Sequence, residues 1–336
     1  PAKGQRYSLP AGAFYALRDG KISRVTVFYN LQDWLRQVGG RTLAFRPAEV
    51  LSGGMKLLSG HARLAGVFGF PVTHSRSPRL HGFWLQRYGI DAAYIPLGVP
   101  PERFGQAVRS LVDLGFRGAN VTIPHKLAAF EICDEVAPFA RRAGAVNTLV
   151  FRDGRIEGSN TDGFGFLESI REAAPGWRAD AGPAVLLGAG GAARAIAAAL
   201  LDAGAPRVTL VNRTPAKAEA LARDLGGPIN VADRPPLAEA ALLVNTTSLG
   251  MQGQPPLEME LGALATSAVV ADIVYVPLET RLLAAARARG LIAVDGLGML
   301  LHQARPGFEA WFGVAPQVDQ ALRDIVAADI PKRDGA

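Results

Sequence analysis

Lys126 and Asp162 are the residues of this sequence best suited to proton chemistry. Lys126 is one of six lysines among 36 basic residues, and it follows the run Asn-Val-Thr-Ile-Pro-His at 120–125. A lysine ammonium acts as a general acid or base when a neighbouring carboxylate orients it. We therefore hypothesise that Lys126 is a general acid/base held by Asp162. The simpler alternatives are a solvated lysine at a helix start and an aspartate that caps the next helix.

Other polar residues follow the predicted strands at the points where these strands end. They are Ser75, Ser77, Asn120, Thr122 and Asn147. The carboxyl ends of parallel strands meet at one edge of a sheet, so these hydroxyls and amides predict, with Lys126, a site for a small polyhydroxylated acid. Taken singly, Ser77 before Pro78 is also typical of a helix N-cap, and Asn147 of a turn.

A glycine-rich turn predicts a nucleotide site. A buried strand ending at Leu187 runs directly into an alanine-rich helix through the residues Gly188, Ala189, Gly190, Gly191 and Ala192. In a strand–turn–helix of this kind, backbone N–H groups and the helix N-terminus bind a pyrophosphate. The alternative is a turn that needs glycine for its backbone alone.

The residues after the next predicted strand indicate which dinucleotide is bound. An enzyme that uses NAD places a carboxylate there, whereas this chain has Asn212, Arg213 and Thr214, with Lys217 one helical turn on. A guanidinium and an ammonium bind a 2′-phosphate through charge-assisted hydrogen bonds. The pattern favours NADP(H) over NAD. The alternative for Arg213 is a solvated surface arginine.

The composition excludes several classes of protein. The net charge is +6, but the arginines are scattered, so nucleic-acid binding is not indicated. A single cysteine, Cys133, excludes a disulfide framework and a thiolate metal cluster, and the histidines have no metal-ligand spacing, so we expect no metal. No apolar run is long enough to span a membrane, and the N-terminus does not resemble a signal peptide, so we expect a cytoplasmic protein with no membrane partner.

The order of apolar runs predicts two successive α/β units, each with parallel strands covered by helices. The chain crosses between the units within residues 162–182. Strands are expected at residues 64–68, 93–97, 119–123, 146–151, 184–187, 207–211, 242–245, 269–273 and 291–294. Helices are expected at residues 78–88, 101–114, 163–173, 192–203, 215–225, 280–289, 299–312 and 316–327.

Residues 1–60 do not follow this pattern. They predict a hairpin, with strands at 13–17 and 23–29 around Asp19-Gly20, and then a short helix at 31–38. These thirty residues resemble the end of a ketosteroid-isomerase-like cone fold. The segment is interpreted as an extension or fusion remnant, or as a partner-docking module. Because Met55 is the first methionine, a second interpretation is that the functional protein starts there.

The ordered motifs from about residue 64 to residue 327 resemble the shikimate dehydrogenase family. They include Gly-Phe-Pro-Val-Thr-His-Ser-Arg-Ser-Pro at 69–78, Asn-Val-Thr-Ile-Pro-His-Lys at 120–126 and Gly-Ala-Val-Asn-Thr at 144–148. They continue with Asn-Thr-Asp-Gly at 160–163 and with the segments 188–193, 212–214, 245–251, 272–275 and 295–300, which lead to Gln303.

The resemblance implies roles for further residues. Ser75 and Ser77 would bind the substrate carboxylate. The other expected substrate contacts are Asn120, Thr122, Lys126, Asn147, Asp162, Tyr275 and Gln303. Besides the glycine turn and residues 212–217, the expected cofactor contacts are Thr246, Ser248, Ile273, Gly296 and Met299. Pro138 departs from the family, whose members often have an acidic residue at this position, and this puts one minor contact near the nicotinamide in doubt.

The resemblance also implies a domain plan and an activity. Residues 61–162, completed by helices in 299–328, would form an α/β substrate-binding and catalytic domain with a mainly parallel sheet. Residues 163–298 would form a Rossmann domain, with the cleft between the two. The expected activity is reversible NADPH-dependent reduction of 3-dehydroshikimate to shikimate by a monomer or homodimer. The alternatives are a catabolic quinate/shikimate dehydrogenase and a non-catalytic NADP-binding relative.

Overall fold

The computed structural model describes residues 11–18, 21–29 and 57–331, and it divides the chain into the units Pro1–Lys56 and Leu57–Ala336. In the first unit, β1 (Ala11–Arg18) pairs antiparallel with β2 (Lys21–Tyr29), with a register shift between Ala16 and Leu17. The predicted hairpin is therefore confirmed. The turn at 19–20 and the helix predicted at 31–38 lie outside the described residues.

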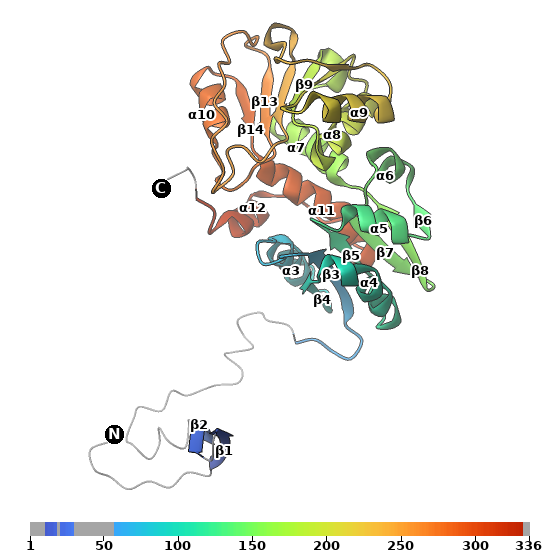
Figure 1. Cartoon of the computed structure of the whole chain (residues 1–336), viewed down its shortest axis with the longest axis vertical. Helices are drawn as coiled ribbons and strands as arrows, with labels where there is room; N and C mark the ends of the chain where they lie inside the picture. The colour runs from blue at the N-terminus through green and yellow to red at the C-terminus, as the bar shows by residue number, and fades with distance from the viewer. Residues whose placement is uncertain (1–10, 19–20, 30–56, 332–336) are drawn as a thin grey trace, which may run out of the picture. The chain divides into compact units, whose positions relative to one another are not determined.

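One sheet of the second unit is entirely parallel (Figure 1). Its order is β11-β10-β9-β12-β13-β14, which is the doubly wound order with its switch point between β9 and β12. Its four inner strands are mostly apolar and almost wholly buried, as expected when helices cover both faces, whereas the edge strands β11 and β14 are partly exposed. The strands are β9 (Ala184–Leu187), β10 (Val208–Val211), β11 (Ile229–Val231), β12 (Leu242–Asn245), β13 (Val269–Asp272) and β14 (Ile292–Val294). The helices that follow β9, β10 and β13 are α8 (Gly191–Asp202), α9 (Pro215–Leu225) and α10 (Arg281–Ala288).

The other sheet has the order β4-β3-β5-β7-β8-β6, and β7 is its one strand that runs against its neighbours. The sheet is therefore mainly parallel, as predicted. Its strands are β3 (Arg63–Gly69), β4 (Ala92–Gly98), β5 (Gly118–Val121), β6 (Glu135–Val136), β7 (Thr148–Arg152) and β8 (Arg155–Ser159). Its helices are α3 (Ser77–Arg87), α4 (Phe104–Asp113), α5 (Lys126–Ile132) and α6 (Pro138–Ala143).

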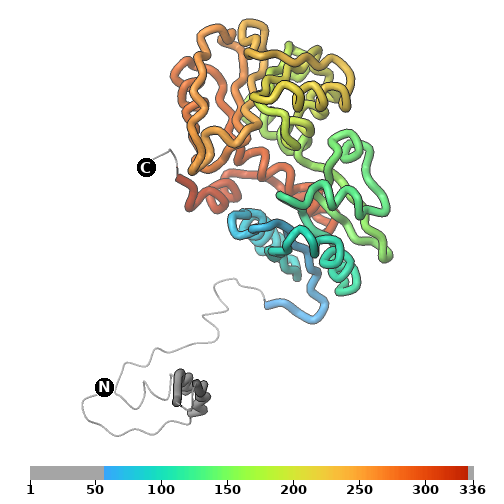
Figure 2. The backbone as a smooth tube through the Cα atoms, viewed as in Figure 1, coloured from blue at the N-terminus to red at the C-terminus, as the bar shows by residue number. Residues whose placement is uncertain are grey.

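Two long helices connect the regions around the two sheets. The first, α7 (Asp162–Ala173), contributes Phe166 and Ile170 to a core cluster on one face of the parallel sheet. The second, α11 (Gly296–Phe312), contributes Leu301 and Phe308 to the core against β3. The tube in Figure 2 shows that the chain returns to the first sheet after completing the second. The two helices lie against each other because Gly165 lets α7 approach the backbone of α11 closely.

Three helices begin several residues away from their predicted starts, and in two of them a capping aspartate sets the start. α11 begins at Gly296, three residues before the prediction, because Asp295 accepts a hydrogen bond from the Leu297 amide at 3.1 Å. α12 (Gln320–Ala327) begins later than the predicted residue 316, because Asp319 caps it through Leu322. At the predicted start of α4, residues Pro101–Arg103 form a 3₁₀ turn.

Within the described residues, no helix combines the length and apolar character needed to cross a membrane.

The contact between α7 and α11 generates a stability prediction. An alanine Cβ at Gly165 would lie 2.7 Å from two backbone atoms of α11, the Gln303 nitrogen and the Met299 oxygen. We expect Gly165→Ala to lower the free energy of unfolding in urea by about 1–3 kcal/mol, because overpacking must displace backbone. The control is Gly82→Ala on α3, where a Cβ meets no atom within 4 Å. Equal stability of the two variants would contradict this account of the helix contact.

Candidate active and cofactor site

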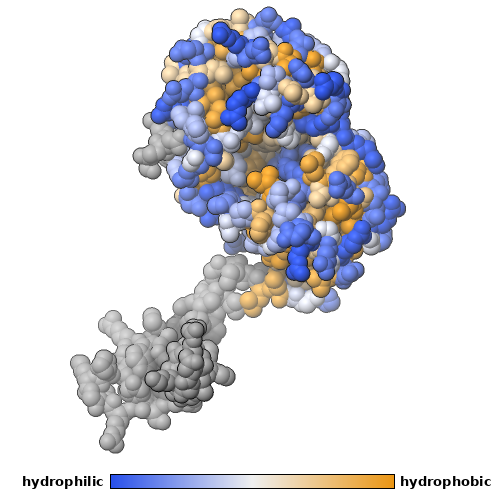
Figure 3. Space-filling view, viewed as in Figure 1, coloured by the Kyte–Doolittle hydropathy of each residue, from blue (hydrophilic) through white to orange (hydrophobic). Residues whose placement is uncertain are grey.

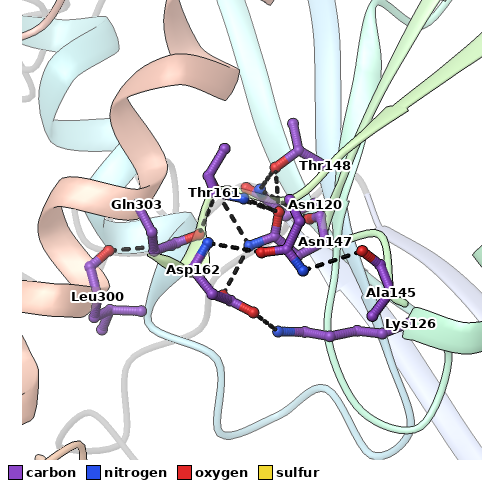
Figure 4. A network of polar contacts seen from close by, with 10 residues as sticks. Asn120, Lys126, Ala145, Asn147, Thr148, Thr161, Asp162, Leu300 and Gln303 are labelled. Atoms are coloured by element: carbon purple, nitrogen blue, oxygen red, sulfur yellow. Dashed lines mark hydrogen bonds and ion pairs between the residues drawn. The ribbon is translucent and has the colours of Figure 1, made fainter. Parts of the chain in front are cut away.

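The structure brings Lys126 and Asp162 together. Lys126 Nζ donates to Asp162 Oδ2 at 2.5 Å, while Asn147 Nδ2 donates to Asp162 Oδ1 at 2.8 Å (Figure 4). The Asp162 side chain is 11% exposed and that of Lys126 is 30% exposed, so the carboxylate is enclosed while the ammonium remains accessible. A mostly buried carboxylate with a charged and a neutral donor can hold a lysine in one position while that lysine exchanges a proton with a ligand.

Three separate elements supply these side chains. Lys126 begins α5, Asn147 directly precedes β7, and Asp162 is the first residue of α7. The capping alternative for Asp162 is wrong, because the N-cap of α7 is Thr161 and Asp162 is the first residue of the helix. The same alternative is wrong for Ser77, which is the first residue of α3 and not its N-cap.

Asn147 is the centre of the polar network in Figure 4. Its Oδ1 accepts from the Thr161 amide at 3.0 Å and from the Thr148 hydroxyl at 2.9 Å. Asn160 holds the backbone of Asp162, two residues on, because its Oδ1 accepts from the Asp162 amide at 3.0 Å. All four of Asn147, Thr148, Asn160 and Thr161 are buried. The network fixes the Asp162 carboxylate from the side opposite Lys126.

The remaining candidate substrate residues lie in different surroundings. Asn120 is buried, and its carboxamide bonds to Tyr94, Thr148 and the Asn147 carbonyl. Ser75 Oγ accepts from the Ser77 amide at 3.3 Å at the start of α3. Gln303 donates to the Leu300 carbonyl at 3.0 Å, and its Oε1 lies 3.5 Å from Thr161 Oγ1. Thr122 and Tyr275 are partly exposed, and burial raises the pKa of Tyr275 against the opposing charge of Arg76.

The glycine turn has the geometry expected of a pyrophosphate site. Gly188 has φ +113°, and a Cβ there would lie 2.6 Å from Thr246 Oγ1. At Gly190 and Gly191 a Cβ would meet no atom within 4 Å, so open space lies in front of the first turn of α8. Unpaired N–H groups at a helix N-terminus attract an anion. The turn therefore fits a dinucleotide phosphate.

The region after β10 fits a 2′-phosphate. Asn212 Nδ2 donates to the Thr214 carbonyl at 2.8 Å, which shapes the turn before α9. Arg213, Thr214 and Lys217 are all exposed there. Neither Arg213 nor Lys217 makes an ion pair within the part of the chain that the structure describes. Two cations without a carboxylate partner are suited to binding a phosphate.

The other candidate cofactor residues surround the ends of β12 and β13. Thr246 Oγ1 donates to the Leu187 carbonyl at 2.7 Å, and Ser248 is exposed in the loop after it. Gly296 lies against the backbone of Ile273, where a Cβ would be 2.1 Å from the Ile273 carbonyl oxygen. Met299 is partly exposed in the first turns of α11. Figure 3 shows a recess in the molecular surface between the regions built on the two sheets.

A buried aspartate, Asp272, fixes these loops. Asn245 Nδ2 and the Val274 amide donate to its Oδ1 at 2.9 and 3.0 Å, and Thr280 Oγ1 donates to its Oδ2 at 2.8 Å. Burial raises the Asp272 pKa to about 6, against the effect of these three hydrogen bonds. Sequence reasoning included this residue in a motif but assigned it no role, because its partners come from three different segments.

Sequence reasoning also missed residues behind the site. Tyr94, Thr148 and Thr161 contribute to the network that holds Asn120, Asn147 and Asp162, but none was a candidate. The pairing of β5 with β7 places Asn120 opposite Thr148, and no short motif reveals this antiparallel pair. Pro138 is the first residue of α6. Among the described residues, no group of three or more His, Cys, Asp or Glu side chains could hold a metal ion.

A doubly wound sheet with a phosphate-binding turn, next to a lysine–carboxylate pair, defines an NADP-dependent oxidoreductase that acts on a CH–OH group. Three family models match the chain: "Shikimate dehydrogenase substrate binding domain" at residues 67–149, "Shikimate / quinate 5-dehydrogenase" at 176–247 and "Shikimate 5'-dehydrogenase C-terminal domain" at 296–323. The chain belongs to the shikimate dehydrogenase family.

Relatives and solved structures agree with this assignment. The chain is 65% identical to the shikimate dehydrogenase (NADP(+)) of Acidiphilium cryptum strain JF-5, over 82% of this chain and 99% of that protein. Shikimate 5-dehydrogenase from Thermus thermophilus, in complex with NADP(H) and shikimate, superposes with a TM-score of 0.71 at 39% identity, covering 79% of this chain and 99% of that one. Quinate dehydrogenase from Corynebacterium glutamicum in complex with NAD gives a TM-score of 0.73 at 30% identity, covering 80% of this chain and 99% of that one.

The raised pKa of Asp272 predicts a dependence of stability on pH. Burial raises this pKa from 3.8 to about 6. Between these values the folded protein therefore keeps a proton that the unfolded chain has lost, and the stability contributed by Asp272 falls as the pH rises. We expect the unfolding free energy of the wild type, relative to that of Asp272→Asn, to fall by about 3 kcal/mol between about pH 4 and about pH 7. Urea titrations across this range measure it, and pH-independent differences would contradict the account.

Proposed function

We propose that this chain catalyses the reversible NADPH-dependent reduction of 3-dehydroshikimate to shikimate, with Lys126 as the general acid/base. The observation that best supports this role is the 2.5 Å hydrogen bond from Lys126 to Asp162, whose second oxygen is held by Asn147. When bound, NADPH supplies a hydride to the C3 carbon of the substrate. Lys126 Nζ gives its proton to the C3 oxygen, while Asp162 orients the lysine and binds an adjacent hydroxyl.

The other candidate residues bind and enclose the substrate. Ser75 and Ser77 bind the carboxylate at the start of α3, where N–H groups of the first helical turn add to the attraction. Thr122, Asn147, Tyr275 and Gln303 contact ring hydroxyls or close over the ring. Asn120 supports the substrate site from the protein interior, because its carboxamide is buried in the network of Figure 4.

Residues at the carboxyl edge of the parallel sheet would hold NADP(H). Gly188–Ala192, at the α8 N-terminus, would bind the pyrophosphate, and Asn212, Arg213, Thr214 and Lys217 would bind the 2′-phosphate. Residues in and after the loops that follow β12 and β13 would contact the nicotinamide half: Thr246, Ser248, Ile273, Gly296 and Met299. The open space at Gly190 and Gly191 and the exposed cations after β10 support this placement.

We further propose a domain plan for the two regions. Residues 61–162 and 299–328 form the substrate-binding and catalytic domain, residues 163–298 form the Rossmann domain, and residues 1–60 are an extension or fusion remnant. The two internal limits fall within the first turns of α7 and α11. The helices shared by the two domains therefore contain the junctions, and both junctions lie next to the proposed substrate site.

The quinate/shikimate alternative and the non-catalytic alternative are not favoured. The shikimate dehydrogenase (NADP(+)) of Acidiphilium cryptum is 65% identical to this chain, whereas the quinate dehydrogenase bound to NAD is 30% identical, and an exposed Arg213 is suited to a 2′-phosphate. Both Lys126 and Asp162 are present and hydrogen-bonded, which argues against a protein that only binds the cofactor. We propose that the enzyme works in the cytoplasm as a monomer or homodimer.

Replacing the proposed acid tests its role. We expect Lys126→Ala to lower kcat by about 10²- to 10⁴-fold with a smaller change in KM for shikimate, because the proton transfer belongs to the transition state. Initial rates of NADPH formation measure both constants. The control is Glu131→Ala, an exposed residue on the same helix, which should keep the wild-type kcat. A near-normal kcat for Lys126→Ala would refute the assignment.

A second variant tests the choice of cofactor. Arg213→Ala should raise KM for NADP by about 10- to 100-fold and leave KM for NAD almost unchanged, because a charge-assisted bond to the 2′-phosphate is lost. Arg223→Ala, an exposed arginine on α9, is the matched control and should change neither constant. Equal changes in KM for both dinucleotides would show that Arg213 does not contact the 2′-phosphate.

A further inference from the structure

A buried line of hydrogen bonds leads from Tyr94 to the Asp162 oxygen that does not contact Lys126. Tyr94 OH donates to Asn120 Oδ1 at 2.6 Å, and Asn120 Nδ2 donates to Thr148 Oγ1 at 3.2 Å. Thr148 Oγ1 donates to Asn147 Oδ1 at 2.9 Å, and Asn147 Nδ2 donates to Asp162 Oδ1 at 2.8 Å. We call these four links, from Tyr94 to Asp162, the relay.

Every link of the relay has the same donor direction. Because the phenol donates to Asn120 Oδ1, the amide nitrogen of Asn120 must face Thr148, and the Thr148 proton is then directed to Asn147 Oδ1. The Asn147 Oδ1 also accepts from the Thr161 amide, and the Asn147 carboxamide therefore presents its nitrogen to Asp162. A carboxamide turned by 180° would place an oxygen against another acceptor, which is costly in a site without water.

The relay is enclosed. The exposed fraction of its members, taken over the whole residue, ranges from 2% for Thr148 to 8% for Asp162, so water cannot replace a missing partner. The Tyr94 ring is fixed by His81, which is fully buried and stacks on it with ring centroids 3.9 Å apart and planes 9° apart. Burial also lowers the His81 pKa to about 3, so this stacked ring is neutral at physiological pH.

The relay starts beside the proposed carboxylate site. Burial raises the pKa of the Tyr94 phenol, against the opposing effect of nearby Ser77 at the start of α3. The relay therefore extends from the neighbourhood of Ser77 to Asp162 through the protein interior. Tyr94 lies on β4, Asn120 on β5 and Thr148 on β7, so three strands of one sheet carry it.

We propose that Tyr94, Asn120 and Thr148 are positioning residues for the acid/base pair. The Tyr94 phenol acts with the Asn147 carbonyl to orient the Asn120 amide, and the Thr148 hydroxyl acts with the Thr161 amide to orient the Asn147 amide. The proposal rests on the proposed function, because it assigns the relay the task of holding Asp162 where Asp162 can orient Lys126. None of the three residues needs to touch the reacting atoms for this purpose.

The test is a double-mutant cycle of Tyr94→Phe and Thr148→Val, each of which keeps the size of the side chain. Tyr94→Phe removes the first link, and Thr148→Val removes the two links that its hydroxyl makes, to Asn120 and to Asn147. We expect each single variant to lower kcat by about tenfold with KM for NADP unchanged, because the directed line of hydrogen bonds is interrupted. We expect the double variant to lose about tenfold and not about a hundredfold, because the two residues act in one series.

The matched control is Tyr88→Phe. The Tyr88 phenol accepts from the Gln317 amide at 3.0 Å, and its ring packs against the same aromatic cluster, but it has no contact with the relay. Tyr88→Phe should keep the wild-type kcat even if its melting temperature falls as far as that of Tyr94→Phe. If Tyr94→Phe does not fold, Thr148→Val alone must still lower kcat about tenfold.

Two results would overturn the proposal. A kcat for both single variants within twofold of the Tyr88→Phe value would show that the phenol and the threonine do not position the pair. Multiplicative losses in the double variant would show that they act independently. Lys126→Ala, assayed alongside, distinguishes a failure of the relay proposal from a failure of the proposed catalytic role. If it loses activity while the relay variants do not, the relay alone fails, and if it keeps activity, the proposed catalytic role fails as well.

Discussion

The geometry of the site depends on the hydrogen bonds to the two carboxylate oxygens of Asp162. One oxygen accepts from Lys126 and the other from Asn147, so the carboxylate connects the accessible ammonium to a buried amide network. A mostly buried charge is stable only when it is paired and hydrogen-bonded, and this requirement accounts for the concentration of polar residues behind it. The same residue begins α7, so the geometry of the Lys126–Asp162 pair and the start of the connecting helix are fixed together.

The contact between α7 and α11 links the position of Asp162, at the start of α7, to the packing of both sheets. α7 packs into the core of the parallel sheet and α11 into the core against β3, and close contact at Gly165 keeps the two together. Asp162 lies at one end of α7, and Gln303 lies in α11 beside Gly165. The residues proposed to surround the substrate are therefore positioned by the helices that join the two sheets.

The sequence predicted the features that local chemistry determines. The strand–glycine turn–helix at 184–202, the strands of both sheets other than β6, β8 and β11, and the candidate pair Lys126 and Asp162 all follow from short patterns. β8 was not predicted because its sequence, Arg-Ile-Glu-Gly-Ser, combines charges with a glycine, and β6 has two residues. Thr148 contacts Asn120 because β7 pairs with β5, and Tyr94 contacts Asn120 from β4, with β3 between the two strands. Contacts between such separate strands leave no local signal in the sequence.

The most direct test of the account is the initial rate of shikimate oxidation by the purified chain, followed by NADPH absorbance, with NAD and quinate in parallel. The account predicts robust turnover with shikimate and NADP, and little with NAD or with quinate. Comparable turnover of quinate with NAD would place the enzyme with the catabolic dehydrogenases and contradict the role given to Arg213. Absence of turnover with every pair would contradict the central claim that Lys126 and Asp162 form a working acid/base site.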